Sequence, residues 1–363
     1  MVIVVLTITK KIPDDIKISR YQRIPELGPR ILFFSGGTAL KGVSKNIVDF
    51  THNSIHLITA FDSGGSSAKI RKAFNMLSVG DLRNRIMALS EKNVLGNKDI
   101  YKLFAFRLSQ KATKDELYNE LLLMLNGKHP LIKTILNPMK RIIINHLSYF
   151  IDKMPYTFKL QGASIGNLIL TGGYLNNRRH IEPVVFIFSK LVDTKGIVRP
   201  ITGSSLHLAV QSSEGKTIIG EHFLSMKSGP LKDQKIEKIW LTKDLENGIP
   251  FSIWVKPKTV NLIESSELIV YPFGSFYSSL IANLLLKGVG RAIAKTGCPK
   301  IFIPNPMHDQ EQTGLSLYEL VCTLLKYLKN DTGEEMQNEN LLNFILIDTE
   351  NGQYQSPMNL SKI

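Results

Sequence analysis

The stretch Ile31-Leu32-Phe33-Phe34-Ser35-Gly36-Gly37-Thr38 decides the fold class. Its first half is short and fully apolar, which is typical of a strand covered on both faces of a sheet. The apolar run ends abruptly at Ser35-Gly36-Gly37-Thr38, and apolar residues then recur with helical spacing at Leu40, Val43, Ile47 and Val48. The stretch therefore predicts a strand, a glycine turn and a helix.

The same arrangement recurs along the chain. Apolar runs precede turn-forming segments at 56–61, 268–271 and 301–303, and each segment leads into a helical pattern. The segments are Asp62-Ser63-Gly64-Gly65-Ser66-Ser67, Pro272-Phe273-Gly274-Ser275 and Pro304-Asn305-Pro306-Met307. Strands that alternate with helices at this spacing favour βαβ units. We therefore expect an α/β, Rossmann-like fold with a mostly parallel sheet and helices on both faces.

The chain divides into segments of different character. Residues 1–30, interrupted by Pro13 and Pro25, are predicted to be an irregular leader, and residues 31–330 a nucleotide-binding α/β domain. Within that domain, residues 90–160 read as a helical insertion and residues 180–256 as a strand-rich segment. Residues 331–363 are polar and are predicted to be a C-terminal tail with a last apolar run at 343–347.

Composition excludes several classes of protein. With 43% hydrophobic and 21% charged residues in a chain of 363, the protein is globular rather than disordered. No apolar run approaches the roughly 20 residues that a membrane span needs. Cys298 and Cys322 are isolated thiols, as expected for a reducing cytoplasm. We therefore expect a cytoplasmic protein without a membrane partner.

The charge points to anionic ligands. The 45 Lys and Arg exceed the 31 Asp and Glu, for a net charge of +14, which favours nucleotides, phosphates or nucleic acid as partners. The basic residues are scattered, and the chain has no zinc-finger, leucine-zipper or RNP-type signature. Nucleic-acid binding is therefore the last-ranked hypothesis.

The predicted strand ends suit a phosphate ligand. Loops that follow parallel strands emerge at one edge of the sheet, where ligands bind at the reversal of strand order. Glycines let backbone amides approach phosphate oxygens, and helix N-termini add partial positive charge. Gly36-Gly37-Thr38 alone fits an ordinary turn equally well, but several such loops at one edge favour a ligand.

Asp62 and Asp81 allow two interpretations. Each could cap a helix, or both could share a magnesium ion with a diphosphate. Near Asp81, Arg83 could neutralise a phosphate and Asn84 could donate a hydrogen bond to it. His308-Asp309 would be an acid–base pair, although a loop histidine with no visible partner is more often a surface residue.

These motifs, taken in order, resemble the CofD/YvcK-like superfamily. The resemblance spans roughly residues 31–330 and is strongest to the GAK-system CofD-like branch. It rests on Ser35-Gly36-Gly37-Thr38, Asp62-Ser63-Gly64-Gly65-Ser66-Ser67, Gly80-Asp81-Leu82-Arg83-Asn84, Gly166-Asn167-Leu168, Gly274-Ser275-Phe276-Tyr277-Ser278-Ser279-Leu280 and Asn305-Pro306-Met307.

The resemblance implies a Rossmann-like fold that holds a nucleoside diphosphate-linked molecule. Its CofD limb consists of 2-phospho-L-lactate transferases, which use a guanosine diphosphate-linked donor and magnesium and release GMP. Its YvcK limb consists of regulators of carbon metabolism and cell-wall supply that bind UDP-sugars. By resemblance, Asp62 and Asp81 lie at the metal. The ligand-binding residues would be Gly36, Gly37, Thr38, Ser63, Gly64, Gly65, Ser66, Ser67, Arg83, Asn84, Asn167, Gly274, Ser275 and Asn305.

Three positions depart from this pattern. Ser63 stands where many relatives have a second aspartate, which removes a potential metal ligand. Ala163 and Phe273 replace the usual residues of YvcK-type proteins. The resemblance therefore leaves open a magnesium-assisted transferase and a UDP-sugar-binding regulator, either of them expected as a homodimer.

Overall fold

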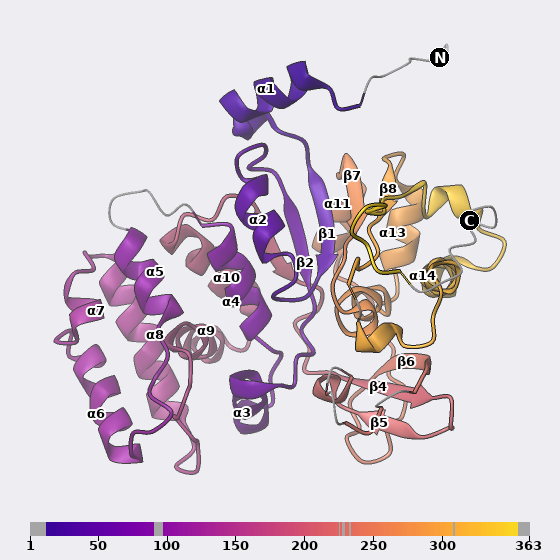
Figure 1. The fold of residues 1–363 in the computed structure, drawn as a ribbon. Helices are drawn as coiled ribbons and strands as arrows, with labels where there is room; N and C mark the ends of the chain where they lie inside the picture. The colour runs from indigo at the N-terminus through magenta and orange to yellow at the C-terminus, as the bar shows by residue number, and fades with distance from the viewer. Residues whose placement is uncertain are drawn as a thin grey trace.

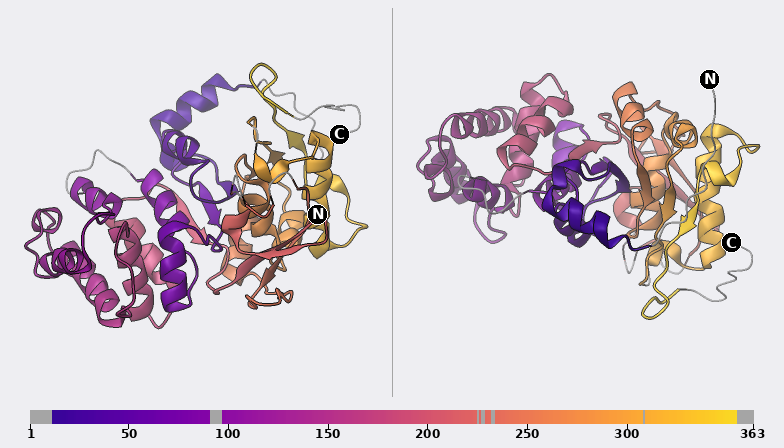
Figure 2. Two further views of the ribbon diagram at one scale, coloured as in Figure 1. Left: turned by 60° about the horizontal axis from the view of Figure 1, so that its bottom comes forward. Right: turned by 90° about the horizontal axis from the view of Figure 1, so that it is seen from above.

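The computed structural model describes residues 12–90 and 97–354, apart from 225, 227, 228, 232, 233 and 308. His308 of the predicted His308-Asp309 pair, and residues 1–11 of the predicted leader, lie outside the described residues. Figures 1 and 2 show a central sheet with a helical segment beyond one end, while the C-terminal half of the chain forms the other end of the sheet and the helices beside it.

The central sheet has six strands in the order β3-β2-β1-β7-β8-β9, and every neighbouring pair is parallel. The strands are β1 (Ile31–Ser35), β2 (Ile55–Ile58), β3 (Ile197–Pro200), β7 (Leu268–Tyr271), β8 (Lys300–Phe302) and β9 (Phe344–Ile345). From β1 the chain builds outward through β2 to β3 and returns to add β7 on the other side of β1. Strand order therefore reverses between β1 and β7, which is where such sheets bind ligands.

Helices cover both faces of this sheet, because successive strand residues point to opposite sides. Leu32 and Phe34 share a core with the helices of one face, whereas Phe33 packs with Leu40 and Val270 on the other. The first face carries α11 (Pro257–Glu264), α12 (Ala282–Leu284), α13 (Val289–Lys295) and α14 (Leu317–Thr332). The second carries α2 (Lys41–Ile47), α4 (Gly80–Ala88) and α10 (Ile181–Leu191). The predicted Rossmann-like α/β class is confirmed.

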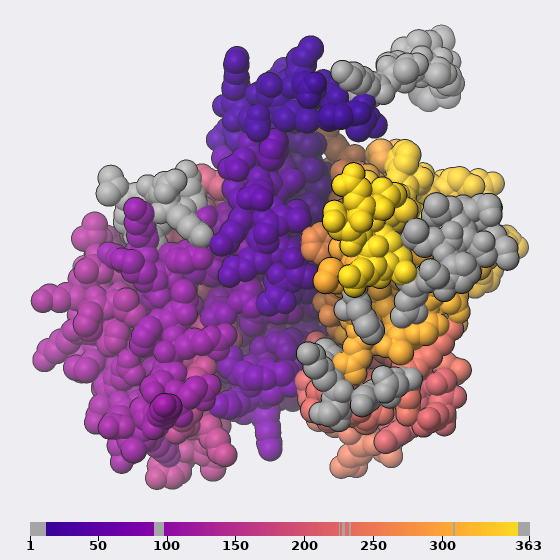
Figure 3. Space-filling model, in the orientation of Figure 1, coloured from indigo at the N-terminus to yellow at the C-terminus, as the bar shows by residue number. Residues whose placement is uncertain are grey.

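A helical segment extends the second face. It contains α3 (Gly65–Phe74), α5 (Asn97–Ala105), α6 (Lys114–Leu125), α7 (Pro130–Lys133), α8 (Met139–Lys153) and α9 (Ile165–Asn176). These helices share one continuous core, to which α4 and α10 also contribute. In Figure 3 the purple and magenta residues of α5 to α9 form a separate bulk beside the indigo N-terminal residues.

A small antiparallel sheet lies on the other side of the molecule (Figure 1). Its strands run in the order β5-β4-β6, with β4 at His207–Ser212, β5 at Thr217–Ile219 and β6 at Ile236–Thr242. It shares its core with β1, β7 and α14. The predicted strand-rich segment therefore supplies this second sheet as well as β3.

Three predicted segments differ from the structure. The leader contains α1 (Asp15–Arg23), a helix with no buried residue and with Ile16 and Ile18 as its only aliphatic residues, so its sequence gives little apolar signal. The strand-rich segment begins with α10, whose Val184, Val185 and Ile187 have high strand propensity. The tail contributes β9, which pairs with β8. None of the described helices combines the length and hydropathy that a bilayer-spanning helix needs.

Candidate functional site

Three glycine loops meet where the strand order reverses. After β1, Gly36 and Gly37 lie so close to the start of α4 that a Cβ on Gly37 would collide with the carboxylate of Asp81. After β7, Gly274 has a φ of 130°, and a Cβ there would lie 3.0 Å from the Cβ of Ala39. Glycine is required at both places, because the backbone approaches another segment closely and, at Gly274, adopts a conformation that other residues avoid.

The loop after β2 joins the same place. A Cβ on Gly80 would lie 2.5 Å from Oγ of Ser67 and 3.4 Å from Oδ2 of Asp62. Nδ2 of Asn167, at the start of α9, donates to Oγ of Ser66 at 3.1 Å. The first turns of α3, α4 and α9 therefore meet. We call the group formed by Gly36, Gly37, Asp62, Asp81 and Asn167 the switch-point site.

Neither aspartate of this site acts as a helix cap. The N-caps of α3 and α4 are Gly64 and Val79, and neither helix has a side-chain capping bond. Oδ1 of Asp62 accepts a hydrogen bond from the Gly64 amide at 2.8 Å, ahead of α3. The uncapped first turn of α3 leaves amide donors and the positive end of the helix dipole available to an anion.

Buried arginines, which the sequence analysis did not identify, fix the loops. Arg85 is completely buried and donates to the carbonyl oxygens of Gly36 and Leu40, both at 3.0 Å, and to Ser44. Arg71 donates to the carbonyl oxygen of Phe61 at 2.7 Å and to that of Leu206. These contacts turn carbonyl oxygens inward, where the guanidinium groups satisfy them.

Several predicted binding residues have other partners. Arg83 is buried and donates to Ser164 and, at 2.6 Å, to Oδ1 of Asn84. Asn305 lines a cavity of about 210 Å³ beside Gln312 and Tyr354, and its Oδ1 accepts from the Met307 amide. These contacts fix the two side chains but do not use all of their donors, because a guanidinium group carries five N–H donors and a side-chain amide two.

The remaining predicted residues lie along the same loops. Thr38 and Gly65 are exposed, and Ser63, Ser66 and Ser275 are half-buried. The hydroxyl of Ser63 is 2.8 Å from Nδ1 of His222 and accepts from its backbone amide at 3.1 Å. Ser63, at the position that carries a second aspartate in many relatives, therefore contacts the 3-10 helix Glu221–Phe223 that follows β5.

Acidic side chains also accept hydrogen bonds from the first amides of the π-helix Phe276–Ile281, which follows Gly274. Buried Glu311 accepts from the amides of Tyr277 and Ser278, both at 2.8 Å, and Asp309 accepts from the Phe276 amide at 3.2 Å. These amides are thus already occupied by carboxylates. The motif after Gly274 positions the loop instead of offering a helix N-terminus to a ligand.

Carboxylates crowd the switch-point site. Burial raises the pKa of Asp81, the charges of Asp62 and Glu221 raise it further, and Arg85 and Arg83 oppose the rise. Burial and Asp62 also raise the pKa of Glu221 to about 7. Glu221 follows β5, and its Oε2 accepts a hydrogen bond from the Ser63 amide at 3.3 Å. The sequence analysis did not identify this residue. The burial of these carboxylates and the repulsion among them favour a bound cation or proton.

The described residues offer magnesium few ligands at the switch-point site. Within the described ranges, no group of three or more His, Cys, Asp or Glu side chains could hold a metal ion. Magnesium, however, is commonly held by one or two carboxylates, with phosphate and water oxygens completing its shell. Asp62 and Asp81 provide such carboxylates, and Oδ1 of buried Asn167 has no hydrogen-bond partner. These residues fit magnesium only together with a phosphate ligand.

We expect Gly37→Ala to weaken any nucleotide binding at this site at least about tenfold, because the added methyl group would displace Asp81 and the loop after β1. The thermal shift produced by GDP or UDP with magnesium measures this loss. Gly42→Ala in α2 is the matched control, since a Cβ at Gly42 meets no atom within 4 Å. Equal nucleotide-induced shifts in the two variants would contradict the prediction.

Glu221→Gln should stabilise the protein at alkaline pH. Because the folded-state pKa of Glu221 is raised to about 7 from 4.5, its stabilising contribution is complete below about pH 4.5 and is lost as the pH rises through 7. The amide keeps an acceptor for Ser63 and carries no charge. At pH 8.5 we expect the free energy of unfolding, measured with urea, to be about 1–3 kcal/mol higher in the variant than in the native chain, and at pH 4.5 almost equal. A gain that does not change with pH would refute this account.

The fold and the switch-point site define a doubly wound α/β protein that brings glycine loops and carboxylates together at the reversal of strand order. The family model described as 2-phospho-L-lactate transferase CofD matches residues 31–360, and the chain belongs to this family. The predicted CofD/YvcK-like membership is confirmed, whereas the resemblance to the GAK-system branch stays a prediction.

Similar proteins carry a different name. A Bacillus subtilis protein named "Gluconeogenesis factor" is 26% identical over 309 residues, which cover 84% of this chain and 75% of that protein. A Nostoc sp. relative is 27% identical over 286 residues, 79% of this chain, and the chain spans only 49% of its length. A crystal structure of a UPF0052 family member from Bacillus halodurans aligns with a TM-score of 0.63 and 23% identity, over 89% of this chain and 81% of that one. This last likeness supports the fold.

Proposed function

We propose that this chain binds a nucleoside diphosphate-linked compound at the switch-point site and transfers its terminal phosphate-bearing group, in a magnesium-assisted reaction of the 2-phospho-L-lactate transferase type. The observation that carries the proposal is the approach of Gly37 to Asp81, with the uncapped start of α3 beside them. Amides suited to phosphate oxygens and carboxylates suited to a cation are thereby combined in one place.

The residues have separate roles in this proposal. The loop amides at Gly36–Thr38 and Gly64–Ser67 would hold the diphosphate, and Arg85 would keep the first of these loops in position. Asp62 and Asp81 would hold magnesium, which when bound supplies charge stabilisation to the departing phosphate. Glu221 lies beside this pair and would accept a proton near neutral pH.

The transfer step balances without a further reactant. The hydroxyl oxygen of an acceptor forms a bond to the distal phosphorus, while the bond from that phosphorus to the bridging oxygen breaks. The electron pair leaves with the nucleoside monophosphate, and the hydroxyl proton passes to a carboxylate or to water. Catalysis of this kind depends on positioning and on stabilising charge.

Release of a nucleoside monophosphate tests this proposal. The native chain would be incubated with magnesium, donors linked to guanosine or uridine diphosphate, and hydroxyl acceptors that include a deazaflavin alcohol. Magnesium-dependent release of GMP or UMP supports the transferase. Absence of release with every donor, in protein that the same donors stabilise against heat, would reject it.

A second candidate is a UDP-sugar-binding regulator that performs no chemistry. Ser63 favours it, because a serine replaces a potential metal ligand and its hydroxyl is held by His222. The name of the Bacillus subtilis relative also points toward metabolism rather than transfer. Thermal stabilisation by UDP-sugars without any product is the outcome expected of a regulator.

A further inference from the structure

A cavity of about 830 Å³ lies between β6 and α14, and none of its lining residues belongs to the switch-point site. Its volume is within the usual range for small-molecule pockets. β6 is an edge strand of the antiparallel sheet, so one wall of the cavity is the outer side of a strand, which is paired with Pro250 and Phe251 only at Leu241 and Thr242. An open strand side exposes backbone groups that need partners.

Two tyrosines supply those partners and form fixed walls. The amide of Ile239 donates to the hydroxyl of Tyr327 at 2.9 Å, and the hydroxyl of Tyr277 donates to the carbonyl oxygen of Ile236 at 3.1 Å. Trp240 and Phe251 add two further aromatic rings to the lining. Ammonium groups lie over these two rings, with Lys238 at 5.9 Å from the centroid of Trp240 and Lys243 at 3.9 Å from that of Phe251, so a ligand ring would pack against the opposite faces.

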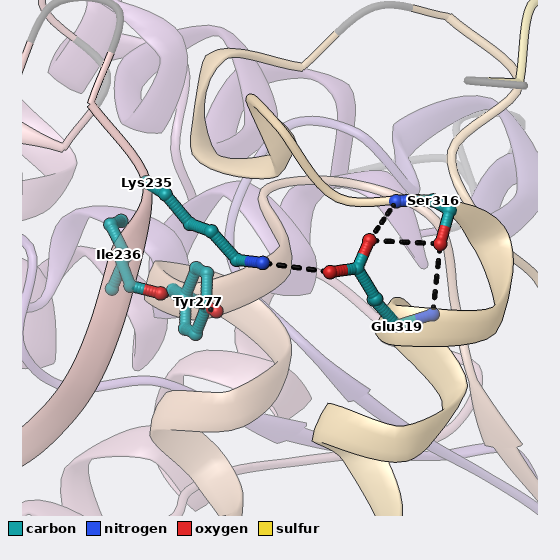
Figure 4. Close-up of polar contacts among 5 residues, drawn as sticks. All are labelled: Lys235, Ile236, Tyr277, Ser316 and Glu319. Atoms are coloured by element: carbon teal, nitrogen blue, oxygen red, sulfur yellow. Dashed lines mark hydrogen bonds and ion pairs between the residues drawn. The ribbon is translucent and has the colours of Figure 1, made fainter. Parts of the chain in front are cut away.

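The charged lining holds three lysines and two glutamates. Lys235 forms an ion pair with Glu319 at 2.7 Å across the cavity (Figure 4), and this bond with the capping contacts from Ser316 lowers the pKa of Glu319 to about 2. Lys238 and Lys326 also line the cavity, and neither forms an ion pair within the described part of the chain. Glu237 is the remaining acid in the lining, so cationic charge is in excess.

We infer that the cavity between β6 and α14 binds a small phosphorylated ring compound of the nucleoside monophosphate class. The phosphate would be held by Lys238 and Lys326, because ammonium groups without acidic partners attract phosphate oxygens. The ring would lie against Trp240 and Phe251. This inference is independent of the function proposed for the switch-point site, since no residue is shared.

Tyr277 gives such a ligand a connection to the rest of the molecule. Its ring lines the cavity, while its backbone amide is bound by Glu311 in the segment that follows Gly274. A molecule in the cavity thus contacts the element that carries one of the glycine loops.

Ligand binding to this cavity can be measured by tryptophan fluorescence. The chain has two tryptophans, and Trp254 does not line the cavity, so in a Trp254→Phe protein the fluorescence reports Trp240 alone. Titration with AMP should change this fluorescence saturably, and AMP should slow the reaction of exposed Cys322, which also lines the cavity, with a thiol reagent. Adenosine and inorganic phosphate should each bind more weakly than AMP.

Substitutions of the lining lysines test whether AMP binds in this cavity. Lys238→Ala with Lys326→Ala should lower the AMP affinity at least about tenfold. Lys216→Ala, in the turn before β5, combined with Lys329→Ala in α14 removes the same charge outside the lining and should leave the affinity unchanged. No saturable response to AMP, equal affinities in the two double variants, or adenosine binding as tightly as AMP would each overturn the inference.

Discussion

Asp81→Asn is expected to abolish magnesium-dependent turnover and, above pH 8, to make the folded protein more stable. Asp81 is held in the folded state with a raised pKa by burial and by the charges of Asp62 and Glu221. Its ionisation in the folded protein is therefore costly, and its contribution to stability is lost as the pH rises through the raised pKa. The same charge would hold the cation, so its removal should lower turnover at least about 100-fold.

Two measurements separate these effects. Release of nucleoside monophosphate reports the loss of function, and thermal unfolding at pH 5 and pH 9 reports stability. We expect the variant to melt at least about 2 °C higher than the native chain at pH 9 and close to it at low pH. Asp152→Asn, an exposed aspartate of α8, is the control. Retained turnover, or destabilisation at pH 9, would rule out this role for Asp81.

Arg85→Met is expected to destabilise the protein by about 3–5 kcal/mol, which is the usual cost of removing one partner from a buried charged network. The side chain is completely buried and satisfies the carbonyl oxygens of Gly36 and Leu40. Without it, these oxygens lose their donors and Asp81 loses an opposing charge. Urea unfolding at pH 7 measures the loss, with Arg141→Met, at an exposed position of α8, as the matched control.

A double-mutant cycle sharpens this test. Part of the stability lost in Arg85→Met comes from leaving the charge of Asp81 without an opposing charge. The double variant Arg85→Met with Asp81→Asn should therefore lose less stability than the sum of the two single variants. Strict additivity would show that Arg85 acts only through the loop carbonyls. A cost below about 1 kcal/mol for Arg85→Met alone would contradict the structural role altogether.

The local elements of the fold could be predicted because their signals are local. The apolar run and glycine turn at Ile31–Thr38 identify β1 and its loop, and Leu268–Tyr271 identifies β7. The neighbour relation between β1 and β7 could not be predicted, because strand order depends on packing between distant segments. β9, at two residues, is too short for a periodic pattern.

The site was predictable at its glycines and at Asp62, Asp81 and Asn167, which stand in the turn-forming motifs of the sequence. Gly36, Gly37 and Gly274 are required by close approaches that sequence patterns suggest. Glu221 reaches the site from the antiparallel sheet, and no local pattern indicates that a residue after β5 contacts the loop after β2. Arg85 had a usable signal, since a charged residue between Leu82 and Ile86 on a largely buried helix needs internal partners.

The central claim is that loops distant in sequence act together on one anionic ligand, and hydrogen–deuterium exchange tests it most directly. With magnesium and a nucleoside diphosphate chosen from ADP, CDP, GDP and UDP by thermal shift, amide exchange should slow together in residues 35–40, 62–68 and 272–275. Slowing in only one of these segments, or only around β6 and α14, would contradict the claim.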